Sequence, residues 1–111
     1  MRLHWRFEWD KKKAVQNLRR HGVTLDDAAV VLGQEDGDFY LIEDYDDEHS
    51  NKEDRYSTFG SHPEDRGKIL RISWTDRTDE EGQVTRIISV RGANSLERKL
   101  YAEQIQRRNR S

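Results

Sequence analysis

The stretch Thr85-Arg86-Ile87-Ile88-Ser89-Val90-Arg91 decides the fold of this chain. β-Branched residues dominate it, which is typical of a β-strand. Strict alternation would divide its side chains between two faces, Arg86 with Ile88 and Val90 on one and Ile87 with Ser89 and Arg91 on the other. One side of the strand must therefore meet water or a ligand, because arginine side chains are seldom fully buried.

A helix is predicted directly after this strand. Apolar side chains recur at helical spacing over residues 95–108, at Leu96, Leu100, Tyr101 and Ile105. Asn94 and Glu97 have the spacing of a pair that caps the start of a helix. We expect the remainder of the chain to complete a sheet beside the strand.

The start of the chain predicts a strand followed by a helix. Residues 3–9 alternate, with Leu3, Trp5, Phe7 and Trp9 on one face. Asp10 is a suitable N-cap for a helix over residues 11–20 that ends at Gly22. Three of its residues are expected to face inward, namely Ala14, Val15 and Leu18.

Three lysines occupy the first turn of that helix, Lys11, Lys12 and Lys13. Positive charge there opposes the helix dipole unless an anion or a carboxylate such as Asp10 offsets it. The pattern has two interpretations: at least one lysine faces a phosphate, or all three are solvated beside Asp10.

The middle of the chain predicts a second helix and then a series of strands. Thr24-Leu25-Asp26-Asp27 resembles a capping box, and the helix is expected to end at Gly33. Strands are expected at residues 38–43, up to Gly60, and at residues 68–75. Connections are expected at 44–48, as an acidic exposed loop, at 61–67, as a turn, and at 76–83, as a charged loop. The order β-α-α-β-β-β-β-α predicts the α+β class.

Composition favours a soluble, cytoplasmic protein of one domain over residues 1–111. Charged residues make up 38% of the chain and hydrophobic residues 32%, there is no cysteine, and no apolar run approaches a membrane span. The charges are segregated: residues 1–21 hold seven Lys/Arg and two Asp/Glu, residues 26–65 two and fourteen, and residues 66–111 eleven and six. Both ends of the chain can thus supply a basic surface.

Five spaced motifs stand in one order along the chain. They are Phe7-Glu8-Trp9-Asp10 with Lys13 and Asn17; His21-Gly22-Val23 with Ala28-Ala29; His49-Ser50 with Glu53 and Arg55; Arg86-Ile87-Ile88-Ser89 with Arg91; and Glu97-Arg98 with Tyr101. The ordered set resembles the BrnT family of bacterial toxins, which belong to type II toxin–antitoxin pairs.

The resemblance implies a RelE-like fold, with two N-terminal helices and an antiparallel sheet with a C-terminal helix. It also implies a metal-independent endoribonuclease that stops translation. The expected partners are the RNA substrate and a BrnA-like ribbon-helix-helix antitoxin, in a hetero-oligomer that contacts promoter DNA only through the antitoxin.

Metal-free cleavage of RNA needs activation of the ribose 2′-OH, stabilisation of charge at phosphorus and protonation of the leaving oxygen. Arginine suits the second task because its planar fork can hold two phosphate oxygens. Arg55 and Arg91 are the first candidates, with surface ion pairs as the competing interpretation. Candidates for proton transfer are His21, His49, Glu53, Lys13 and Tyr101. The predicted catalytic set is Lys13, His49, Arg55 and Arg91.

No cofactor and no metal are expected, because the four histidines lack ligand spacing and no Gly-rich phosphate loop is present. Two other functions fit the same residues. One is a non-catalytic module whose arginines only hold nucleic-acid phosphates, and the other is a protein-interaction domain that acts only within a repressor complex.

Overall fold

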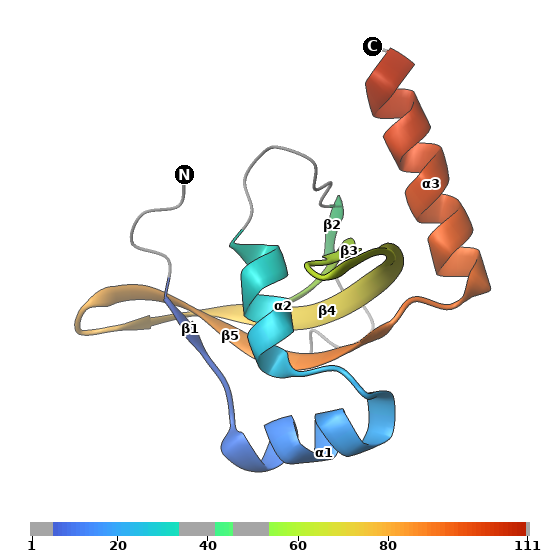
Figure 1. Cartoon of the computed structure of the whole chain (residues 1–111). Coiled ribbons are helices and arrows are strands. Elements are labelled where there is room, and N and C mark those ends of the chain that lie inside the picture. Colours follow the sequence, from blue (N-terminus) through green and yellow to red (C-terminus); the bar gives the residue numbers. More distant parts are fainter. Residues whose placement is uncertain (1–5, 34–41, 46–53, 111) are drawn as a thin grey trace.

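A computed structural model describes residues 6–33, 42–45 and 54–110 of the chain (Figure 1). Its elements are β1 (Phe7–Glu8), α1 (Lys11–His21), α2 (Leu25–Leu32), β2 (Ile42–Tyr45), β3 (Arg55–His62), β4 (Asp65–Asp79), β5 (Gly82–Gly92) and α3 (Ser95–Arg110). The strands form one sheet in the order β1-β5-β4-β3-β2. The predicted α+β fold, with two N-terminal helices, a sheet and a C-terminal helix, is confirmed.

Most of the sheet is the expected antiparallel meander. β2, β3, β4 and β5 pair with their neighbours in antiparallel fashion, whereas β1 lies parallel to β5 at the edge. β1 is short: within the described residues only Phe7 and Glu8 of the predicted 3–9 strand are extended partners of β5. The sheet is therefore mixed.

The two N-terminal helices are bounded as predicted. Asp10 Oδ1 accepts hydrogen bonds from the backbone N–H groups of Lys12 and Lys13, at 2.8 and 3.3 Å. Gly22 ends α1 in the left-handed conformation (φ 71°), a region that favours glycine. Thr24 Oγ1 accepts from the N–H of Asp27 at 3.1 Å and begins α2.

The inward face of α1 differs from the prediction at two of the three residues named, because Ala14 alone of them packs against the core. Val15 and Leu18 are 52% and 48% exposed, whereas Asn17 is only 6% exposed. The Asn17 amide donates to the carbonyls of Val23 and Val90 and accepts from the N–H of Val90. α1 therefore lies along the edge of β5 beyond the end of β1, where it satisfies strand backbone groups and needs little apolar surface (Figure 1).

The β-hairpins are longer than predicted. β3 and β4 are joined by a two-residue turn at Pro63-Glu64, and β4 and β5 by a turn at Glu80-Glu81. The predicted seven- and eight-residue connections at 61–67 and 76–83 are therefore wrong. Charged side chains can occupy exposed strand ends, and Arg6 binds Asp79 and Glu81 there.

β2 includes Ile42 and Glu43 of the predicted strand and continues through Asp44 and Tyr45, which were expected in a loop. Residues 38–41 and 46–48 of the predicted strand and loop lie outside the described residues.

A β-bulge interrupts the alternation of the deciding stretch. Ser89 pairs with Ser73 but Ile87 pairs with Trp74, so Ile88 has no counterpart on β4. As a result Ile87 and Val90, three residues apart, both reach the core and are 2% and 0% exposed. Strict alternation, which placed them on opposite faces, is wrong at this point.

The core lies between α2 and one face of the sheet. α2 buries Leu25, Ala28, Val31 and Leu32 against residues from β4 and β5, namely Leu70, Ile72, Trp74, Ile87 and Val90. The Trp74 ring also stacks on Tyr56, with centroids 4.8 Å apart. Core packing therefore fixes one face of the sheet, and the other carries Arg71, Ser73 and Arg91 together with the apolar Phe59.

Candidate active site

Arg91 is held in a fixed orientation on the sheet face opposite α2. Its two terminal nitrogens donate to Glu97 Oε1 and Oε2 at 2.7 and 2.9 Å, a bidentate pair. Arg71 is its cross-strand neighbour on β4, and Arg71 Nε lies 3.6 Å from Glu97 Oε2. One carboxylate thus holds two guanidinium groups side by side.

Glu97 is itself held by the start of α3. Its Oε1 accepts from the Asn94 N–H at 2.9 Å, and Asn94 Oδ1 accepts from the Glu97 N–H at 2.8 Å, which confirms the predicted capping pair. The hydrogen bonds from Arg91, followed by that from the Asn94 backbone and the charge of Arg71, lower the pKa of Glu97 below its ordinary value. The same contact raises the pKa of Arg91.

Arg55 lies on the same face as Arg91, in a different cross-strand row. It pairs with Thr75, which pairs with Arg86, and Arg86 donates to Glu8 at 3.2 Å. Between the rows of Arg55 and Arg91 lies a row of three serines, Ser57, Ser73 and Ser89. The Cα atoms of Arg55 and Arg91 are separated by about 13 Å along the strands and about 10 Å across them.

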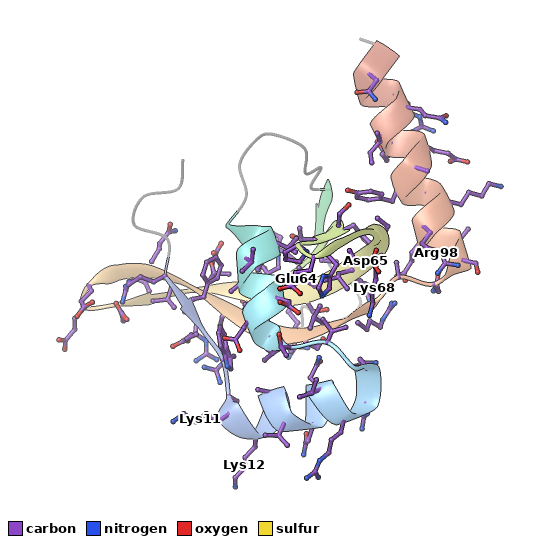
Figure 2. All side chains as sticks on the ribbon, in the orientation of Figure 1. Lys11, Lys12, Glu64, Asp65, Lys68 and Arg98 are labelled. Atoms are coloured by element: carbon purple, nitrogen blue, oxygen red, sulfur yellow. The ribbon has the colours of Figure 1, made fainter. Side chains whose placement is uncertain are left out.

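Lys13 lines a groove between α1 and the edge of β5. The groove has a volume of about 200 Å³, and its lining residues are Lys13, Gln16, Asn17, Arg20, His21, Ile88 and Ser89. We call it the α1 groove. Lys11 and Lys12, in contrast, point away from the sheet (Figure 2). The structure therefore separates the three lysines of the first turn, because only Lys13 lines the groove.

Arginines beside the sheet form ion pairs with carboxylates, and the basic residues of α1 differ from them in this respect. On the sheet, Arg71 and Arg91 face Glu97, Arg86 faces Glu8, and Arg6 faces Asp79. α1 has the sequence KKKAVQNLRRH, with no carboxylate within it. Within the part of the chain that the structure describes, no carboxylate forms an ion pair with any of its cationic side chains.

The predicted catalytic residues thus occupy three places: Lys13 in the α1 groove, Arg55 on β3 and Arg91 on β5. His49 lies outside the described residues. Ser89 connects two of these places, because it lines the α1 groove and is two residues from Arg91 on β5.

Sequence reasoning missed three features of the site. Alternation in β4 predicts Arg71 on the face opposite the buried Leu70 and Ile72, but its place beside Arg91 depends on strand pairing. The seven-residue spacing of Lys13 and Arg20 could have put both on one helix face. The contact of Glu97 with both arginines carried no sequence signal.

His21, His62 and Tyr101 lie in three different parts of the structure. His21 lines the α1 groove, whereas His62 Nε2 lies 3.1 Å from Asp27 Oδ2. Tyr101 is 5% exposed, as expected of a helix contact. The described residues contain no group of three His, Asp or Glu side chains placed to hold a metal ion.

Comparison with known families identifies the chain. The model of the family described as "Ribonuclease toxin, BrnT, of type II toxin-antitoxin system" matches residues 9–97. The chain belongs to the BrnT family. It is therefore a ribonuclease toxin with an RNA target and an antitoxin partner. No curated protein matches the chain.

The BrnT match covers most of the site described above. It extends from Trp9, just before α1, to Glu97 in the first turn of α3. Lys13, Arg55, Arg71 and Arg91 lie inside it, whereas residues 98–110, the greater part of α3, lie beyond its end. Within the described residues, no helix is long and apolar enough to cross a membrane.

Proposed function

We propose that this BrnT protein cleaves RNA internally without a metal ion and leaves a 2′,3′-cyclic phosphate. Cleavage in the cytoplasm would stop translation and growth. Lys13, His49, Arg55 and Arg91 are the proposed catalytic residues. The observation that carries the proposal is the arginine pair Arg71 and Arg91, held side by side by Glu97 in a chain of a ribonuclease family.

The arrangement of Arg91 suits stabilisation of the transition state. Attack by the 2′-oxygen places additional charge on the oxygens around phosphorus, and a planar guanidinium can donate to two of them. Because Glu97 already fixes the Arg91 side chain, little reorganisation is needed when the charge develops. Arg71 supplies a second positive charge beside it.

The remaining proposed residues have distinct tasks. Arg55 lies in a different row of the sheet, so we assign it to a neighbouring group of the same RNA chain. Lys13 and His49 are proposed for proton transfer or charge neutralisation at the 2′-oxygen and the leaving 5′-oxygen.

The proposed partner is a BrnA-like ribbon-helix-helix antitoxin. It would neutralise the toxin by forming a hetero-oligomer, and the complex would bind its promoter DNA through the antitoxin alone.

Growth after induction of the chain without antitoxin tests the proposal. We expect the wild-type chain to stop growth and protein synthesis, and Arg91→Ala to permit both, because the Ala side chain cannot donate to the phosphate. Arg6→Ala is the matched control: it also removes an ion-paired arginine, but one that lies at the far hairpin and binds Asp79.

Pulse labelling of new protein gives the readout. Equal arrest by the wild type and Arg91→Ala would contradict the role of Arg91. Absence of arrest by a folded wild-type chain, with antitoxin binding intact, would favour the protein-interaction alternative.

A further inference from the structure

We propose that the α1 groove is a binding subsite for the sugar–phosphate backbone of the RNA, with Arg20 as a principal phosphate contact. This inference rests on the proposed function and deepens it. Of the predicted catalytic residues that the structure describes, Lys13 alone lines the groove.

The charge of the α1 groove favours a phosphate. Lys13, Arg20 and His21 line one groove, and within the described chain no carboxylate forms an ion pair with any of them. The arginines Arg71 and Arg91 on the sheet, in contrast, share Glu97. Asp10, the N-cap of α1, attracts Lys13 through charge but forms no ion pair with it. A phosphate entering the α1 groove therefore meets positive charge that no ion-paired carboxylate offsets.

Basic side chains at the end of a helix have a competing role, which is to stabilise the helix. Arg19, Arg20 and His21 occupy the last turn of α1, where positive charge favours the helix dipole. This role applies equally to neighbouring residues of the turn, which ends where the Gly22 N–H donates to the Leu18 carbonyl at 2.8 Å. Arg19 and Arg20 can both interact favourably with the helix dipole. They differ in position, because only Arg20 lines the groove.

The α1 groove has polar lining residues that can contact a ligand, and it is continuous with the surface around Arg91. Asn17 forms part of the wall with all its polar atoms engaged, so Lys13, Gln16, Arg20, His21 and Ser89 remain to contact a ligand. Ile88, the bulged residue, adds an apolar surface. Ser89 and Arg91 are two residues apart on β5, about 7 Å. One RNA strand can therefore run from the groove to Arg91.

The direct test is binding of a short, fluorescent 2′-O-methyl oligoribonucleotide, which lacks the 2′-OH nucleophile and stays intact. We expect Arg20→Ala to weaken binding about tenfold, the loss of one charge-assisted phosphate contact. The slope of log affinity against log salt should fall by about one. Arg19→Ala removes the same charge from the next residue, and we expect a change of less than about twofold.

A second readout separates the subsite from the catalytic residues. With cleavable RNA, we expect Arg20→Ala to raise KM about tenfold with little change in kcat, whereas Arg91→Ala should lower kcat. Equal unfolding free energies of the variants establish that each effect arises in the folded protein.

Each contrary outcome has a definite meaning. Equal effects of Arg19→Ala and Arg20→Ala would show a diffuse charge effect and overturn the subsite, as would a wild-type chain that does not bind the probe. Loss of antitoxin binding in Arg20→Ala with RNA binding unchanged would assign the groove to the antitoxin and also overturn the subsite. Groove-dependent binding by a wild-type chain that never cleaves RNA would retain the subsite and reject the proposed activity.

Discussion

Asn17 joins α1 to β5 through both ends of its side-chain amide. It is buried, and it replaces the hydrogen bonds that a neighbouring strand would otherwise make to Val90. It also binds the carbonyl of Val23, in the connection between the helices. One polar side chain therefore positions the helix that forms a wall of the α1 groove.

The stability of Asn17 variants tests this role. Asn17→Ala leaves two carbonyls and one N–H without their partner, and we expect a loss of about 3 kcal/mol in the free energy of unfolding. Val15→Ala changes an exposed residue on the same helix and should stay within about 0.5 kcal/mol of the wild type. Urea denaturation measures both. A larger loss for Val15→Ala would support the inward face predicted from apolar spacing.

At the scale of elements, Glu97 joins α3 to β4 and β5. Its side chain caps the helix and binds arginines on both strands, and it is 16% exposed. Tyr101 of α3 is also buried, whereas Leu96 and Leu100 are exposed. The far end of α3 extends away from the sheet (Figure 1). This one carboxylate therefore couples the position of a helix to the orientation of the proposed catalytic arginine.

The lowered pKa of Glu97 predicts a pH dependence. Because the folded-state pKa lies below the ordinary value of 4.5, the ionised side chain stabilises the fold above pH 4.5, and this contribution is lost as the pH falls through the folded-state pKa. We expect Glu97→Gln to be less stable than the wild type by about 1 kcal/mol at pH 7, since solvent partly screens the pair.

The difference between Glu97→Gln and the wild type should disappear in acid, where both side chains are neutral. Unfolding free energies measured between pH 7 and pH 3 test this expectation. A difference that is constant over the whole range would show that the pair contributes no pH-dependent stability.

The sequence predicted elements whose signals are local. Asp10, Thr24 and Asn94 begin the three helices as expected, because caps depend on residues two or three positions away. The bulge at Ile88 and the extension of β4 to Asp79 were missed, because they depend on pairing with distant residues. The exposure of Leu18 was missed for a related reason: apolar spacing does not reveal that a helix lies at a strand edge.

In the candidate site, too, local features could be predicted from the sequence and contacts between distant residues could not. Residue type identified Arg91 and Lys13 as phosphate-binding candidates. The pairing of Arg71 with Arg91, and the closure of a groove by α1, became visible only when strands and helices distant in sequence were brought together.

At the scale of the whole molecule, two basic regions meet at β5. The sheet presents arginines that are already oriented by carboxylates, and α1 presents cations without ion-pair partners in the described chain. Ser89 lies between them. In the proposed account, the cations of α1 attract and hold the RNA backbone, and the oriented arginines stabilise the reacting phosphate.

The most direct test of this account is cleavage of a defined RNA by the purified, antitoxin-free chain in excess EDTA, with the product ends identified. We predict internal cuts that carry 2′,3′-cyclic phosphates and that disappear in Arg91→Ala but persist in Arg6→Ala. Intact RNA with a folded wild-type chain, or cleavage that requires a restored divalent metal ion, would contradict the account.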